Sequence, residues 1–108
     1  MPIWTTSFTL DDLLPFWRGT TDEHIGLRIT AFGDDWLEGT VGLEPRTSGG
    51  SAALHPGTLA ILCEALGSVG ANLCVDRTTH YCLGQILEVH HPLPIERGPV
   101  CGLSLIHI

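Results

Sequence analysis

The segment from Pro56 to Cys74 constrains the fold more than any other part of the sequence. Leucines and other apolar residues recur in it with the 3.6-residue period of a helix, and alanines and Ile61 cover the remaining faces. Pro56 suits the first helical position, where its missing N–H costs nothing. We therefore expect a long helix that is mostly enclosed. Its glycines at positions 57, 67 and 70 favour close approach of other backbone.

Strand patterns lie on both sides of this helix. Residues 25–31 and 36–43 partly alternate apolar and other residues, and the turn sequence Gly33-Asp34-Asp35 between them predicts an antiparallel hairpin. The order of elements predicts an α+β domain with one antiparallel sheet packed around a central helix. The other expected elements are a short amphipathic helix at 9–18, a loop at 46–53, an extended stretch at 81–91, a turn at 96–99 and a strand from 100 onward.

Length and charge limit the class of protein. The chain has 108 residues, the size of a single domain, and no apolar run approaches the roughly 20 residues of a membrane span. A formal net charge of -7 disfavours nucleic acid as a partner, and no membrane association is expected. The N-terminus does not resemble a signal peptide, which predicts a cytoplasmic protein.

The cysteines and histidines predict neither disulfides nor a metal site. The 4 cysteines form no C-x-x-C pair, and we expect them to be buried free thiols. Of the histidines, only His90 and His91 are close in sequence. Adjacent residues of a strand point to opposite faces, so this pair is a poor chelator and no metal or other cofactor is expected.

The last six residues, 103–108, are an apolar run without a turn signal or a charged tail. The codon string CTG TCT CTT ATA CAC ATC, which encodes the same six residues, resembles a transposon-end adapter used in preparing sequencing libraries. One interpretation is therefore that residues 1–102 are an incomplete natural domain and that 103–108 are a non-native tail. The alternative is a genuine C-terminal strand.

Glu64 is the most unusual residue of the expected helix, because a carboxylate in an enclosed helix is costly unless it is paired, neutralised or needed. Ser68 lies four residues later on the same helical face, so both side chains can face one cavity. His55 precedes the helix, whose N-terminus favours a developing negative charge. Nine helical steps separate His55 from Glu64 by about 13 Å, which is too far for the two groups to work together within one copy, but they could meet across a two-fold dimer.

The segments Leu54-His55-Pro56-Gly57 and Leu62-Cys63-Glu64-Ala65-Leu66-Gly67-Ser68 resemble the hotdog-fold acyl-CoA thioesterases. Their spacing is similar to that of the PaaI-like subgroup with a glutamate on the central helix, such as the 1,4-dihydroxy-2-naphthoyl-CoA and 4-hydroxybenzoyl-CoA thioesterases. The resemblance extends over residues 3–102. It includes the hairpin at 33–38, the start of an active-site loop at Arg46-Thr47, and a strand at 84–91.

The resemblance implies a role for each candidate residue. Glu64 would be the catalytic carboxylate, which attacks the thioester carbonyl or activates a water molecule. Ser68 would position the water or the carboxylate, and His55 with the helix N-terminus would polarise the thioester oxygen. His91 would lie near the nucleotide of coenzyme A. The structural alternatives are a side chain that faces solvent through a gap for Glu64, a buried core histidine for His55, a backbone-bonded hydroxyl for Ser68, and a surface strand position for His91.

Three positions depart from the family pattern. The family has glycine where this chain has Pro56, which has no N–H to donate to an oxyanion, so only the Gly57 N–H remains. The family's loop glutamine is Gly49 here, and an arginine that contacts coenzyme A phosphate is Leu93. These changes remove polar contacts to the substrate.

Two functions follow from the resemblance. The first is a thioesterase that hydrolyses an aromatic or medium-chain acyl-CoA as a homodimer or homotetramer. The second is a catalytically weakened hotdog protein that binds acyl-CoA or serves as a structural subunit. The resemblance also implies further strands beyond residue 102.

Overall fold

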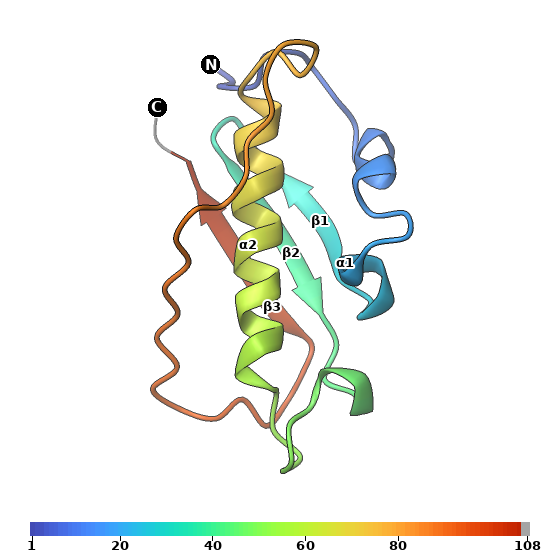
Figure 1. The fold of residues 1–108 in the computed structure, drawn as a ribbon, viewed down its shortest axis with the longest axis vertical. Helices are drawn as coiled ribbons and strands as arrows, with labels where there is room; N and C mark the ends of the chain where they lie inside the picture. Colours follow the sequence, from blue (N-terminus) through green and yellow to red (C-terminus); the bar gives the residue numbers. More distant parts are fainter. Residues whose placement is uncertain (107–108) are drawn as a thin grey trace.

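A computed structural model describes residues 1–106, in which one long helix packs on a three-stranded antiparallel sheet of order β1-β2-β3 (Figure 1). This arrangement confirms the predicted combination of an antiparallel sheet with a central helix. Residues 107–108 of the predicted tail lie outside the described part. The elements are η1 (Asp11–Phe16), α1 (Thr21–His24), β1 (Arg28–Phe32), β2 (Trp36–Val41), η2 (Pro45–Thr47), α2 (Pro56–Leu73) and β3 (Val100–Leu105).

Strand β2 is the middle strand and carries most of the buried residues of the sheet. Its residues alternate between half-buried and buried, so Leu37, Gly39 and Val41 face inward. β1 and β2 form the predicted hairpin, with an irregularity in the pairing between Ile29 and Ala31. The alternation predicted from the sequence is therefore confirmed over β2.

Helix α2 approaches the sheet over a pair of glycines. Gly39 of β2 is the register partner of Gly102 of β3. A Cβ atom at either glycine would come within about 3 Å of the side chains of Leu62 or Leu66. The absence of side chains at these two positions therefore allows the leucines of α2 to lie close to the sheet. The buried core around this contact comprises Leu13, Trp17, Ile25, Leu27, Leu37, Val41, Leu54, Leu62, Ala65, Leu66, Val69, Leu73 and Val100.

The glycines inside α2 differ in their surroundings. At Gly70 the expected approach of other backbone is wrong, since a Cβ atom there would overlap the Ile106 side chain and lie 3.4 Å from Leu37 Cδ1. At Gly67 the expectation is wrong, because a Cβ atom there would meet nothing within 4 Å. The approach at Gly70 is made by side chains and not by other backbone.

The N-terminal region differs from the helix predicted at 9–18. The structure has a shorter 3-10 helix, η1, with Pro15 inside it. Proline removes a backbone donor and clashes with the preceding turn of an α-helix, which explains the change. Before η1, the Thr9 N–H donates a hydrogen bond to Asp12 Oδ2 at 2.8 Å. The short helix α1 that follows was not predicted.

The segment 81–91 contains no β-strand, so the strand that the family resemblance implied at 84–91 is not formed within the described residues. In Figure 1 this orange segment runs beside α2, apart from the sheet. A strand requires a partner whose N–H and C=O groups pair with its own, and none of the described strands reaches this segment. Tyr81, Leu83 and Ile86 consequently remain largely exposed.

Residues 103–105 belong to β3 and pair with residues 36–38 of β2. Their natural or adapter-derived origin stays a prediction.

The cysteines are free, but the expectation that all are buried is wrong, since Cys63 and Cys101 are exposed. Part of the expected loop at 46–53 belongs to the 3-10 helix η2. Within residues 1–106, no helix combines the length and the apolarity that a membrane span requires.

Candidate active site

Glu64 and Ser68 line one pocket, as their four-residue spacing predicts. The cavity has a volume of about 440 Å³ and lies between α2, α1, the end of η1 and the segment 81–91. Both residues are half-buried. Their companions are Phe16, Thr21, Asp22, Ala60, Ile61, Ala65, Val69 and Leu87. The pocket therefore combines a mostly apolar wall with two carboxylates and two hydroxyl groups.

The backbone of Gly84 closes one side of the Glu64 carboxylate. A Cβ atom at position 84 would overlap both carboxylate oxygens. No hydrogen bond or ion pair joins the Glu64 side chain to another group in residues 1–106. The carboxylate is thus held in place by packing and keeps its oxygens available as acceptors, which a general base or nucleophile requires.

Asn72 fixes the segment that carries Gly84. Its amide nitrogen donates to Ser68 O at 2.8 Å and to Cys82 O at 3.0 Å. The Cys82 N–H donates to Asn72 Oδ1 at 2.8 Å. Asn72 is buried, so it ties the start of the segment 81–91 to α2. Sequence reasoning missed this residue, although a polar amide inside an enclosed helix was a signal of the same kind as Glu64.

Asp22 is a second carboxylate in the pocket, and sequence reasoning also missed it. Thr20 caps α1 by accepting a hydrogen bond from the Glu23 N–H at 3.3 Å. Of the four residues of α1, only Asp22 is half-buried; the others are exposed. Burial raises the pKa of Asp22, and the nearby Glu64 carboxylate raises it further.

His55 lies at the N-terminus of α2 and caps it. Its Nδ1 accepts a hydrogen bond from the Gly57 N–H at 2.8 Å, and its backbone oxygen accepts one from the Thr58 N–H at 2.9 Å. The neutral ring therefore carries its proton on Nε2. The side chain is exposed, so the alternative of a buried core histidine is wrong.

The first N–H groups of α2 are already engaged. Pro56 has no N–H, and the Gly57 N–H donates to the imidazole. The predicted use of Gly57 as an oxyanion donor therefore requires that His55 releases it. Neither His55 nor Gly57 lines the Glu64 pocket, in keeping with their expected separation along one helix.

The loop before α2 places Gly49 beside His55. A Cβ atom at Gly49 would lie 3.9 Å from two atoms of His55, so a longer side chain at this position would project next to the imidazole. Thr47 holds the loop, because it is fully buried and its Oγ1 donates to Gly42 O at 2.7 Å. The Thr58 hydroxyl also donates to Thr47 O at 3.1 Å, which joins the loop to α2.

The remaining candidate, His91, is half-buried, and its Nε2 is enclosed without a hydrogen-bond partner among residues 1–106. Leu93 is largely exposed.

Burial and the neighbouring Cys82 raise the pKa of the Cys74 thiol, which disfavours the thiolate that a nucleophile needs. In the described part of the chain, no three His, Cys, Asp or Glu side chains gather as metal ligands.

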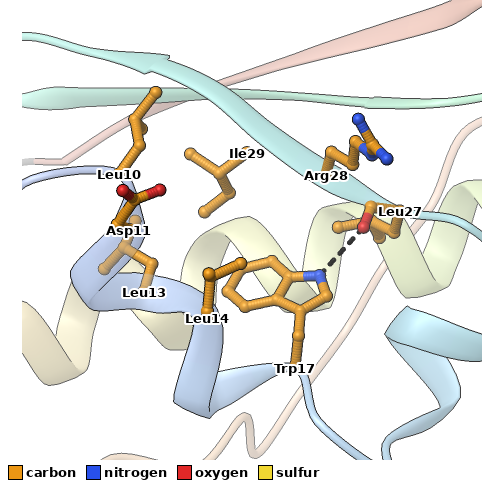
Figure 2. Close-up of a pocket in the computed structure, with 8 residues that line it drawn as sticks. All are labelled: Leu10, Asp11, Leu13, Leu14, Trp17, Leu27, Arg28 and Ile29. Atoms are coloured by element: carbon orange, nitrogen blue, oxygen red, sulfur yellow. Dashed lines mark hydrogen bonds between the residues drawn. The ribbon is translucent and has the colours of Figure 1, made fainter.

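A second pocket lies between the η1 region and the start of β1. Figure 2 shows Leu13, Leu14 and Trp17 facing Leu27 and Ile29, with the Trp17 Nε1–H donating to Leu27 O at 3.0 Å. Its volume is about 390 Å³, and its charged groups are Asp11 and Arg28. None of the candidate residues predicted from the sequence lines it.

Known proteins resemble the chain over most of its length, although no family model matches it. The chain is 35% identical over 101 residues to the proofreading thioesterase EntH of Cronobacter turicensis, and this match covers 94% of the chain and 73% of the relative. Thioesterase HI1161 from Haemophilus influenzae has a TM-score of 0.89 and 30% identity, over 95% of this chain and 71% of that one. A mutant of thioesterase PA1618 from Pseudomonas aeruginosa has a TM-score of 0.92 and 29% identity, and the match covers 98% of this chain and 77% of that one.

Proposed function

Because this chain belongs to the thioesterase superfamily, we propose that it hydrolyses the thioester of an aromatic or medium-chain acyl-CoA with Glu64 as the catalytic carboxylate. That it is a thioester hydrolase follows from its relatives. The choice of acyl-CoA and the role of Glu64 are the proposal. The observation that supports it is the Glu64 carboxylate itself, half-buried in a mostly apolar pocket with Ser68.

The reaction needs a base and a stabiliser of the developing oxyanion. In the proposed mechanism Glu64 takes a proton from water as the resulting hydroxide adds to the thioester carbon. The C–S bond then breaks, the protonated Glu64 carboxyl gives its proton to the leaving sulfur, coenzyme A leaves as the thiol, and the carboxylic acid is released. Direct attack by Glu64, with hydrolysis of the resulting anhydride, is the other form of the same proposal. Ser68 would orient the water or the carboxylate.

His55 would polarise the thioester oxygen. Since Nδ1 accepts from the Gly57 N–H, the Nε2–H of the exposed imidazole is free to donate to a substrate. His55 caps α2 and Glu64 lies in its interior, so we propose a homodimer or homotetramer in which one protomer supplies His55 and its partner supplies Glu64. A hotdog fold of the PaaI-like glutamate subgroup, a cytoplasmic location and contacts of Pro56, Gly49 and His91 with coenzyme A belong to the same proposal.

Variants at Glu64 test this function. We would measure thiol release with a thiol-trapping dye from benzoyl-CoA, phenylacetyl-CoA and octanoyl-CoA. Glu64→Gln keeps the shape of the side chain and should lower kcat by about 10²–10⁴-fold. Glu96→Gln is the matched control, because Glu96 is exposed and lies outside the pocket. Equal rates for the wild type and Glu64→Gln would overturn the role of the carboxylate.

The second candidate is a weakened protein that binds acyl-CoA or serves as a structural subunit. The observation that favours it is the engaged N-terminus of α2, where Pro56 offers no N–H and the Gly57 N–H is bound to His55. Loss of one oxyanion donor costs other enzymes about 2.7–4 kcal/mol in the barrier. Saturable binding of benzoyl-CoA without thiol release would support this candidate and contradict the first.

A further inference from the structure

Asp22 adds a second negative charge to the Glu64 pocket. It is the half-buried residue of α1, and the Leu27 N–H donates to its backbone oxygen at 3.0 Å, which anchors the end of the short helix. Its side chain reaches the same cavity as Glu64 from a different element. The direction of the Asp22 pKa, raised first by burial and then by Glu64, agrees with this proximity.

The described lining contains no cation, and the guanidinium of Arg77 lies behind it over the Phe16 ring, 4.8 Å from the ring centroid. The other polar groups are the hydroxyls of Thr21 and Ser68, and the rest of the wall is apolar, including Phe16 and Leu87. A cavity with low-dielectric walls and two charges of one sign strengthens the field inside it. An acyl group that enters this cavity therefore meets a negative potential. This potential is stronger than that of Glu64 alone, because Asp22 adds a second charge.

We propose that Asp22 is a specificity-determining residue, which favours acyl groups ending in a cation or a hydrogen-bond donor and rejects acyl groups that carry a carboxylate. The inference rests on the proposed function, because it assumes that the acyl group occupies the Glu64 pocket. Like charges placed together in a binding site are a general means of excluding a competing ligand. Glu64 serves the reaction, while Asp22 determines which acyl groups are accepted.

Three substrates with the same ring test this assignment. Benzoyl-CoA is neutral, 4-carboxybenzoyl-CoA adds an anion, and 4-(aminomethyl)benzoyl-CoA adds a cation. For the wild type we expect kcat/KM for the anionic substrate to be about 10-fold or more below that for benzoyl-CoA. The cationic substrate should be accepted at least as well as benzoyl-CoA.

Asp22→Asn removes the charge and keeps the shape of the side chain. We expect it to raise the ratio of kcat/KM for 4-carboxybenzoyl-CoA to that for benzoyl-CoA by about 10-fold. Asp22→Ser is a second variant that removes the same charge. Glu23→Gln is the control, because Glu23 is the next residue of α1 and is exposed. Glu23→Gln should leave the ratio of kcat/KM for 4-carboxybenzoyl-CoA to that for benzoyl-CoA unchanged.

The ratio compares two substrates on the same protein, so partial loss of folded protein cancels. If Asp22→Asn and Asp22→Ser keep the wild-type ratio, Asp22 does not determine specificity. A wild type that accepts the anionic substrate as well as benzoyl-CoA also overturns the inference while leaving the proposed function intact. If the wild type releases thiol from none of the three substrates, the proposed function fails and the inference fails with it.

Discussion

The carboxylate of Glu64 lies against the backbone of Gly84, so closely that any side chain at position 84 would overlap both carboxylate oxygens. The two residues come from different parts of the chain, Glu64 from α2 and Gly84 from the segment that follows it. The position of the proposed base thus depends on a segment without regular secondary structure. That segment is in turn tied to α2 by Asn72.

Gly84→Ala should displace the carboxylate. The added Cβ atom cannot share the space of the Glu64 oxygens, so either the side chain or the segment must move. A misplacement of about 1 Å costs enzymes up to 10²-fold, and we expect kcat to fall at least 10-fold. The measurement is thiol release from benzoyl-CoA. Gly50→Ala is the control, since a Cβ atom there meets nothing within 4 Å. Equal activity of the two variants would contradict this account.

Asn72→Ala should release the start of the segment 81–91. It removes the hydrogen bonds to Ser68 O, Cys82 O and the Cys82 N–H. We expect a loss of about 1–3 kcal/mol in the free energy of unfolding, measured with denaturant. Faster amide hydrogen exchange at Cys82 would locate the effect. Asn72→Asp keeps the acceptor for the Cys82 N–H and should protect that amide better than Asn72→Ala does.

The helix 56–73 and the hairpin could be predicted because their signals are local. Apolar residues at helical spacing, Pro56 at the start and alternation along 36–41 specify these elements without knowledge of their partners. The shared pocket of Glu64 and Ser68 also followed from spacing within one helix. Whether the segment 81–91 forms a strand depends instead on a partner strand, which a local pattern does not reveal.

The rest of the site depends on tertiary packing. Asp22 belongs to a four-residue helix, and only the packing of α1 beside α2 brings it to the Glu64 pocket. The capping hydrogen bond from the Gly57 N–H to His55 depends on one side-chain rotamer, which the sequence does not specify. The role of Gly84 is visible only because the Glu64 carboxylate occupies the space of its missing side chain.

Gly67→Ala should stabilise the protein. The position is exposed in the interior of α2, and a Cβ atom there meets nothing within 4 Å. Alanine in a helix interior gains up to about 1 kcal/mol over glycine, or about 4–8 °C in Tm for a domain of this size. Gly70→Ala is the comparison, because its Cβ atom overlaps Ile106 and contacts Leu37. Thermal unfolding that shows equal gains for both variants would contradict the packing described around Gly70.

Asp22→Asn should also stabilise the protein, in a pH-dependent way. The folded-state pKa of Asp22 lies above its ordinary value of 3.8, so the charged carboxylate costs stability at neutral pH. Removing the charge should add up to about 0.5 kcal/mol there, since the half-buried group is partly screened by solvent. The gain should disappear as the pH falls through the raised pKa and then below 3.8, where the wild type is protonated in both states. Thermal unfolding of the wild type and Asp22→Asn at neutral pH and below pH 3.8 checks this prediction. The control Glu23→Gln, at an exposed position, should show no such gain in stability.

Pro56→Ala should raise activity by restoring an N–H at the first position of α2. The Gly57 N–H donates to His55, so the new N–H at position 56 would be the first free donor for an oxyanion. Removing one such donor lowers kcat about 10²–10³-fold in other enzymes, and we expect a gain of at least 10-fold here. Pro56→Gly should give a similar gain, because the donor and not the flexibility of the backbone is the cause. Pro45→Ala, at the first position of η2, is the matched control for proline removal and should leave kcat unchanged. A gain in Pro56→Gly alone would assign the effect to flexibility, and no gain in either variant would show that the missing donor does not limit the reaction.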